Sequence, residues 1–148
     1  MQAILADKPA DMIITTHVCR GNYKSSYLLT GAYDPVADGL FGQTSYDGYF
    51  LEYDDERSGG FEPLKHFANN KGRVVLGLIS SKFPELEDKE AIKARIQEAA
   101  KYVPLEQLCL SPQCGFASTE EGNVMTEAQQ WAKVRHVEEI AKEVWGED

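Results

Sequence analysis

Four short apolar runs, separated by segments with helix signals, constrain the fold of this chain more than any other feature of its sequence. Each run is rich in β-branched or aromatic residues and is continuously apolar, whereas a strand with one solvated face alternates apolar and polar residues. Continuous apolar runs are typical of parallel strands that are covered on both faces. The predicted strands span residues 12–19, 48–53, 73–80 and 107–111.

The segments between these runs carry signals for helix starts. The start signals are Asp34-Pro35 (N-cap and first residue), Pro63, Asp88, and Thr126 with Gln129 as its capping-box partner. Apolar residues recur after Asp88 at spacings of three and four, which places them on one face of a helix. Strands that alternate with helices predict an α/β fold, and four βα units form either a small open sheet or half of an eight-stranded barrel. In both architectures, ligands bind where the strands end.

The acidic composition argues against polyanionic partners. The chain has 148 residues and a net charge of -9, and none of its 15 basic residues forms a stripe, so we expect neither nucleic acid nor an anionic membrane as a partner. It has no apolar run near the roughly 20 residues that span a bilayer, and its start lacks the pattern of a signal peptide. Three cysteines, an odd number, fit a reducing compartment. We therefore expect a cytoplasmic protein in which residues 1–148 form a single unit.

Four residues with metal-binding side chains fall at the ends of predicted strands. They are His17, Cys19, Glu52 and Cys114. Side chains two positions apart on a strand point to the same face, so His17 and Cys19 are expected to lie together. Zinc binds cysteine sulfur, histidine nitrogen and, less often, carboxylate oxygen. The four side chains would therefore satisfy a tetrahedral zinc site at one rim of the sheet.

Simpler interpretations compete for several of these residues and their neighbours. A cysteine in an apolar run is most often a small buried residue, which is the expectation for Cys109. Glu52 in an apolar strand needs a compensating partner, and an ion pair with Arg57 would supply one. The acidic run that begins at Asp54 is most simply a solvated loop, yet Asp54 follows one predicted strand and Ser80 ends another, so both are candidates for substrate binding. Of the remaining residues, His66 and His136 are expected at the surface, and Trp131 and Trp145 in the core.

Three motifs together resemble the cobalamin-independent methionine synthases, specifically their C-terminal catalytic domain and its short stand-alone relatives. The motifs are Thr16-His17-Val18-Cys19, Phe50-Leu51-Glu52 and Ser111-Pro112-Gln113-Cys114-Gly115. The resemblance covers nearly the whole chain. It implies an eight-stranded (βα) barrel in which His17, Cys19, Glu52 and Cys114 bind zinc at the C-terminal mouth.

The activity that this resemblance implies is methyl transfer from N5 of a methyltetrahydrofolate, usually polyglutamylated, to the sulfur of homocysteine, which gives methionine. A free thiol with a pKa near 8.5 is mostly protonated at neutral pH, and coordination to zinc leaves a reactive thiolate. Family members commonly carry a histidine after the strand predicted at 73–80, which supplies a proton to the folate leaving group. Lys82 stands there in this chain, and lysine, with a pKa of about 10.4, is a poorer acid near neutrality unless burial lowers that value. A solvated loop lysine is the alternative interpretation.

The length of the chain sets a second departure from the family. A full barrel takes about 200 residues or more, and by resemblance this chain begins in the helix before the fifth strand. Four βα units would leave two sheet edges and an apolar inner face unpaired, which is costly for a monomer. We therefore expect a homo-oligomer or association with a separate N-terminal half. Two other functions stay open: a non-catalytic remnant that binds zinc or thiols, and another zinc-thiol methyltransferase, such as those that act on coenzyme M.

Overall fold

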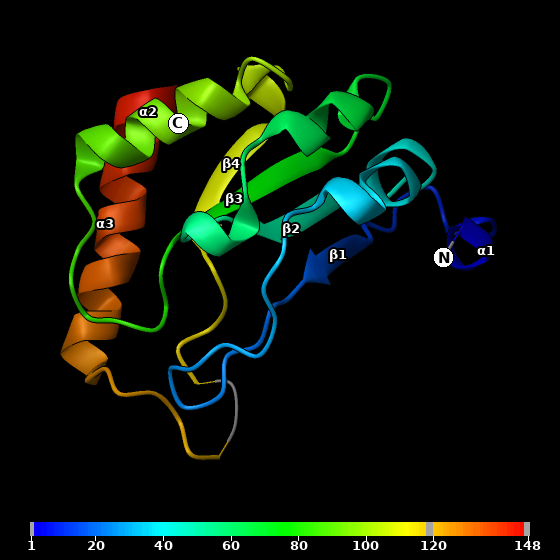
Figure 1. Cartoon of the computed structure of the whole chain (residues 1–148). Helices are drawn as coiled ribbons and strands as arrows, with labels where there is room; N and C mark the ends of the chain where they lie inside the picture. Colours follow the sequence, from blue (N-terminus) through cyan, green and yellow to red (C-terminus); the bar gives the residue numbers. More distant parts are fainter. Residues whose placement is uncertain (1, 118–119, 147–148) are drawn as a thin grey trace.

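The computed structural model of the chain describes residues 2–117 and 120–146. Within them, four parallel strands form a sheet in the order β1-β2-β3-β4 (Figure 1). The strands are β1 (Thr15–Val18), β2 (Gly48–Glu52), β3 (Arg73–Ile79) and β4 (Leu108–Pro112). Because each strand pairs in parallel with its neighbour in the sequence, every connection crosses over one face of the sheet, as in βα units.

Two long helices and several short helical turns complete the described chain: one long helix lies between β3 and β4, and the other follows β4. The α-helices are α1 (Gln2–Leu5), α2 (Lys89–Ala99) and α3 (Glu127–Trp145). The short elements are η1 (Asp34–Val36), η2 (Asp38–Gly42), η3 (Glu56–Ser58), η4 (Glu62–Phe67) and η5 (Leu105–Gln107). The long helices start as expected: the Asp88 side chain caps α2, and Thr126 and Gln129 form a capping box at α3.

The two faces of the sheet have different surroundings. The residues of one face pack into the core with the helices and are at most 2% exposed: Tyr49, Leu51, Val74, Leu76, Leu78 and Leu108. The opposite face is exposed at Thr15, His17, Phe50 and Arg73. The expectation that both faces are covered is therefore wrong at these four positions. Of the four residues only Phe50 is apolar, so the expected apolar character also fails at Thr15, His17 and Arg73. This four-stranded parallel sheet, with its helices on one side, has the arrangement of half of a (βα) barrel.

Two local expectations are also wrong. The first strand begins at Thr15 rather than at residue 12, because Met12 and Ile13 are exposed and the Ile14 N–H donates to the Asp47 carboxylate (2.7 Å) instead of to a strand. Asp34 does not cap a helix, since it is itself the first residue of η1. Of the apolar residues in this segment, Leu40 and Phe41 are buried, whereas Val36 is 51% exposed.

The histidine and tryptophan expectations for α3 are partly reversed. His136 is buried, because the loop at Glu87 packs over α3 and the Glu87 backbone oxygen lies 2.8 Å from His136 Nε2. Trp131 is 55% exposed, whereas Trp145 packs against the core and donates to the Leu105 carbonyl (3.0 Å). The side of α3 that meets residues 81–88 therefore faces inward.

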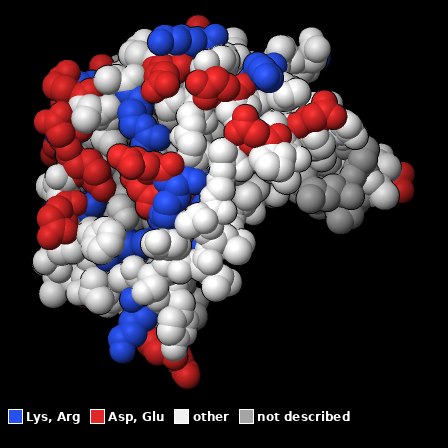
Figure 2. Space-filling view, in the orientation of Figure 1, with Lys and Arg blue, Asp and Glu red and all other residues white. Residues whose placement is uncertain are grey.

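The surface is rich in charged groups. Figure 2 shows acidic side chains gathered on the side of the molecule where α2 and α3 lie, with basic side chains between them. Among the helices that the structure describes, none has the length and apolar composition needed to cross a membrane.

Candidate metal centre

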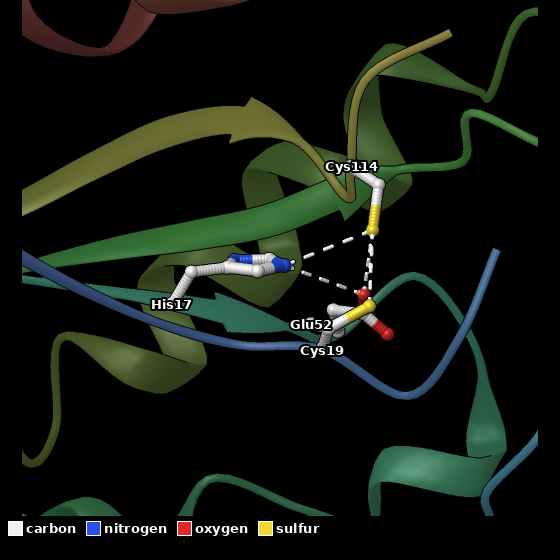
Figure 3. A group of neighbouring side chains, drawn as sticks. All are labelled: His17, Cys19, Glu52 and Cys114. Atoms are coloured by element: carbon white, nitrogen blue, oxygen red, sulfur yellow. Dashed lines mark hydrogen bonds and ion pairs between the residues drawn. The ribbon is translucent and has the colours of Figure 1, made fainter. Parts of the chain in front are cut away.

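Four side chains from three strands converge at one end of the sheet (Figure 3). One potential ligand atom from each of His17, Cys19, Glu52 and Cys114 lies within 4.8 Å of every other. Cys114 Sγ is 3.7 Å from Cys19 Sγ, 3.8 Å from His17 Nε2 and 2.8 Å from Glu52 Oε1. His17 Nε2 is 3.8 Å from Glu52 Oε1. The structure thus brings together all four residues that the sequence pointed to.

The sheet explains why these residues meet. His17 lies on β1 and Cys19 directly follows it, Glu52 is the last residue of β2, and Cys114 comes two residues after β4. Parallel strands end at the same edge of a sheet, so the residues at their carboxyl ends are neighbours. The pairing of β3 with β4 shifts register beyond Gly77, and a Cβ at Gly77 would stand only 2.8 Å from the Leu51 carbonyl oxygen. A glycine is therefore needed at position 77 on β3, next to the segment that leads from β4 to Cys114.

The donor set fits zinc in both chemistry and spacing. Zinc–ligand bonds of about 2.0–2.3 Å in a tetrahedron put the ligand atoms about 3.3–3.8 Å apart. Three of the measured separations, 3.7, 3.8 and 3.8 Å, fall within this range. The contact of 2.8 Å between Cys114 Sγ and Glu52 Oε1 is shorter because it is a hydrogen bond from the thiol. Two sulfurs, an imidazole and a carboxylate suit zinc better than they suit magnesium or calcium, which prefer oxygen.

Without a metal ion, the environment of the cluster favours the protonated form of the Cys114 thiol. Burial raises the pKa of the Cys114 thiol well above its ordinary value, and the hydrogen bond to Glu52 and the negative charges of Glu52 and Cys19 raise it further. The protonated thiol donates to Glu52 Oε1. Metal binding must therefore release a proton from this site, because the thiolate is the form that coordinates.

Glu52 is fully buried and has partners other than the expected one. Its Oε2 accepts from the Arg20 backbone N–H (3.0 Å) and from Gln113 Nε2 (3.1 Å). Arg57, the predicted ion-pair partner, instead bonds Asp55 and lies 3.9 Å from Asp54. The ion-pair interpretation of Glu52 is therefore wrong.

Lys82 and Asp54 form a buried pair, and Asp54 comes two residues after Glu52 in the sequence. Their side chains are 2% and 3% exposed, and Lys82 Nζ lies 3.7 Å from Asp54 Oδ2. Burial raises the pKa of the Asp54 carboxyl, and the positive charge of Lys82 opposes this effect. The interpretation of Lys82 as a solvated loop lysine is therefore wrong.

Two further residues lie outside the cluster. The Ser80 hydroxyl accepts from the Lys82 backbone N–H (3.3 Å) and so shapes the loop after β3. Cys109 is half-buried rather than buried, on the open face of the sheet, with its sulfur 3.8 Å from Arg73 Nη1.

Asn22 joins the loops that surround the cluster. It is buried, and its Nδ2 donates to the Gly115 carbonyl (3.1 Å) and to the Ser81 hydroxyl (3.4 Å). Sequence reasoning assigned no role to Asn22, Arg20 or Gln113. The only signal was position, because Arg20 and Gln113 directly adjoin the predicted ligands Cys19 and Cys114.

Comparisons with known proteins identify the family of this chain. Residues 6–142 match the family of the cobalamin-independent synthase catalytic domain. The uncharacterized Bacillus subtilis proteins YxjG and YxjH are 58% and 57% identical to the chain over 141 residues. Each match covers 95% of this chain and 37% of the relative, so the chain spans well under half of their length.

Two solved structures share the fold. A putative vitamin-B12-independent methionine synthase from Listeria monocytogenes superposes with a TM-score of 0.74 and 50% identity, over 97% of this chain and 38% of that one. A B12-independent methionine synthase from Shewanella sp. W3-18-1, solved in complex with selenomethionine, gives a TM-score of 0.73 at 19% identity, over 94% and 40%. The half-barrel and the family match lead to one conclusion: this chain belongs to the cobalamin-independent methionine synthase family, of whose catalytic domain it represents a part.

Proposed function

We propose that this chain carries the zinc site of a methyltransferase that moves a methyl group from 5-methyltetrahydrofolate, in its polyglutamate form, to the thiol of homocysteine and forms methionine. The observation that carries the proposal is the convergence of His17, Cys19, Glu52 and Cys114 within 4.8 Å. Family membership and the names of the solved relatives support it. Because the chain spans about two fifths or less of these relatives, the activity is a proposal for the assembled protein.

The four ligands would set the reactivity of the substrate sulfur. When bound, zinc would act as a Lewis acid that lets the homocysteine thiol lose its proton near neutral pH. Cys19, Glu52 and Cys114 are anionic in their ligating forms, so together they exceed the 2+ charge of zinc by one. This excess would keep the substrate sulfur electron-rich and therefore nucleophilic.

The proposed transfer balances as a simple displacement. A lone pair on the homocysteine sulfur forms the new bond to the methyl carbon, while the bond from that carbon to N5 breaks and leaves its electrons on N5. N5 then takes up one proton. Lys82, which occupies the family's proton-donor position, is the proposed source, and Asp54 and Ser80 are the proposed substrate contacts at the same rim.

Replacement of one ligand tests the metal site directly. Cys114→Ser should purify with less than a tenth of the zinc of the wild-type chain, because serine oxygen is a poor ligand for this ion. The matched control is Cys109→Ser on β4, the strand that precedes Cys114, and this variant should retain its zinc. Metal content is measured by mass spectrometry on protein that is purified from cells grown in zinc-supplemented medium. Full zinc content in Cys114→Ser would contradict the assignment.

A second candidate function is the binding of zinc and small thiols without turnover, which the same four side chains would support. Homocysteine would then change the spectrum of the cobalt-substituted site, but no methionine would form even when the N-terminal part of a relative is added. Methionine formation from a methylfolate would exclude this alternative. Methyl transfer to coenzyme M would instead identify the chain as part of a coenzyme M-type methyltransferase.

The proposal includes a partner and a location. We propose that residues 1–148 form the C-terminal half of a (βα)8 barrel and pair with an N-terminal half or with a second copy. The exposed sheet face with His17 and Phe50 supports such a contact. The cytoplasm is the proposed location, because its reducing conditions keep Cys19 and Cys114 as free thiols.

A further inference from the structure

The two carboxylate oxygens of Glu52 have different surroundings. Oε2 accepts two hydrogen bonds, from the Arg20 backbone N–H (3.0 Å) and from Gln113 Nε2 (3.1 Å). Oε1 faces the other members of the cluster, 2.8 Å from Cys114 Sγ and 3.8 Å from His17 Nε2. Since Glu52 is fully buried, water does not compete for either oxygen. Oε2 is therefore anchored to the protein, and Oε1 is the oxygen that can bind a metal ion.

The backbone brings Gln113 to Glu52 across an intervening strand. Gln113 follows β4, whereas Glu52 ends β2, and β3 lies between them. The Gln113 N–H donates to the Ile79 carbonyl (2.8 Å), just after the register shift on β3. At Gly77 a Cβ would stand 3.1 Å from Gln113 Cα. The chain thus passes close over β3, and the buried Gln113 side chain reaches the carboxylate.

The orientation of the Gln113 amide follows from its partners. A carboxylate only accepts hydrogen bonds, so Nε2 must face Glu52 Oε2. The other amide atom, Oε1, is buried and has no hydrogen-bond partner among the described residues. A buried unpaired carbonyl is costly. If Gln113 served packing alone, an apolar residue would avoid that cost, so the donated hydrogen bond is the feature that explains a glutamine here.

We propose that Gln113 is a positioning residue that holds Glu52 as a ligand through Oε1 alone. The terminal torsion of a glutamate is broad, so an unrestrained carboxylate would sample several orientations before it binds a metal ion. Gln113 and the Arg20 N–H restrict that rotation through Oε2, and the neutral amide adds no charge to the cluster. Partners that orient metal ligands commonly contribute 10–100-fold to metal affinity. This inference rests on the proposed zinc site and goes beyond it by assigning the residue that orients one ligand.

The test replaces the donor while it keeps the volume. Gln113→Met removes the N–H with little change in shape, and Gln107→Met is the matched control. Gln107 Nε2 also donates to protein oxygens, those of Asn70 (3.1 Å) and Gly72 (3.0 Å), but at the opposite end of the sheet. Zinc affinity is measured by competition with a chelator, and the visible spectrum of the cobalt(II) form reports the ligand geometry. Thermal unfolding of the metal-free proteins measures any structural loss separately.

Gln113→Met should bind zinc about 10–100-fold more weakly than the wild-type chain and should show a changed cobalt spectrum. Gln107→Met should keep both properties, whatever stability it loses. Unchanged zinc affinity in Gln113→Met, beside a wild-type chain that binds zinc, would overturn this inference and leave the proposed function intact. A wild-type chain that binds no zinc would overturn both.

A second variant covers a folding failure of the first. Gln113→Asn keeps an amide but withdraws it by one methylene, so Glu52 Oε2 would retain the Arg20 N–H as its donor and lose the other. It should weaken zinc binding about 10-fold or more. If Gln113→Asn matches the wild-type affinity, the positioning role is wrong.

Discussion

Glu52 pairs with Gly77 of β3 on one side, whereas side chains hold its backbone on the side that faces β1. The pairing of β1 with β2 ends at Val18 and Leu51, one residue before Glu52. The Tyr33 hydroxyl accepts from the Glu52 N–H (2.8 Å) and donates to the Glu52 carbonyl oxygen (3.2 Å). Arg20 Nη1 donates to the same carbonyl (2.8 Å). These hydrogen bonds take the place of the pairing with β1 that ends one residue earlier.

Two buried tyrosines allow a matched test of this arrangement. Tyr33→Phe should lower the free energy of unfolding by about 1–3 kcal/mol, because it leaves the buried Glu52 N–H without its acceptor, while the Glu52 carbonyl keeps Arg20 as a donor. The Tyr53 hydroxyl is also buried but has no hydrogen-bond partner among the described residues. Tyr53→Phe should therefore change stability by less than about 0.5 kcal/mol. Urea denaturation measures both values, and equal losses would contradict this account.

At the same scale, the sequence predicts the four ligands but not what orients them. Residue type and position at strand ends indicated His17, Cys19, Glu52 and Cys114, and the family motifs supported them. The hydrogen bond from Gln113 to Glu52 depends on how closely the chain passes over β3, and no local pattern encodes that distance. The burial of Lys82 depends in the same way on its approach to Asp54, so its loop position in the sequence did not decide between a buried and a solvated lysine.

The two long helices are joined by ion pairs on the surface. Lys89 Nζ on α2 lies 2.8 Å from Glu139 and 3.0 Å from Glu143 on α3, and Lys93 Nζ lies 2.8 Å from Glu143. The hydrogen bond from Lys93, and then that from Lys89, lowers the pKa of Glu143. The hydrogen bond from Lys89 lowers the pKa of Glu139. These contacts connect the last two βα units.

These lowered pKa values predict the direction of an acid effect. A carboxyl whose pKa is lower in the folded than in the unfolded chain stabilises the fold above the unfolded pKa, near 4.5 for glutamate, and loses this contribution as the pH falls through the folded value. Glu143→Gln should therefore lose less stability than the wild-type chain when the pH falls below about 4.5. The groups are exposed, so the difference should be small and should shrink in 1 M salt. Thermal unfolding at several pH values measures it, and an equal loss in both proteins would contradict the prediction.

The elements themselves were predictable where local signals are strong. The caps at Asp88 and Thr126 place the starts of α2 and α3, and the apolar runs place four strands, because periodicity and capping act within a few residues. The first strand was predicted too long, since Met12 and Ile13 are apolar but have no neighbour to cover them. The burial of His136 was missed because it depends on the loop at Glu87, which is distant in the sequence.

The molecule as a whole has an open sheet face and two strand edges. Phe50 on this face is 37% exposed, and β1 and β4 each lack a neighbour on one side among the described residues. Unpaired strand edges next to exposed apolar surface favour association.

We predict that the chain forms a dimer or larger species at micromolar concentration, and that Phe50→Lys weakens this association at least tenfold. A buried aromatic side chain at the centre of a contact commonly contributes this much. Sedimentation velocity measures the species, with Trp131→Lys on the exposed side of α3 as the control. A wild-type chain that stays monomeric, alone and with the N-terminal part of a relative, would contradict the prediction.

The distribution of the ligands over the sheet has a mechanical consequence. His17 belongs to β1 and Cys114 follows β4, the two outermost strands. In a flat sheet, three strand spacings of about 4.8 Å would separate these strands by about 14 Å, yet Cys114 Sγ and His17 Nε2 are 3.8 Å apart. The sheet and its terminal loops must therefore bend into an arc before the ligands can meet. If the cluster binds zinc as proposed, its affinity would depend on the curvature of the half-barrel, and a contact that flattens or tightens this arc would change that affinity.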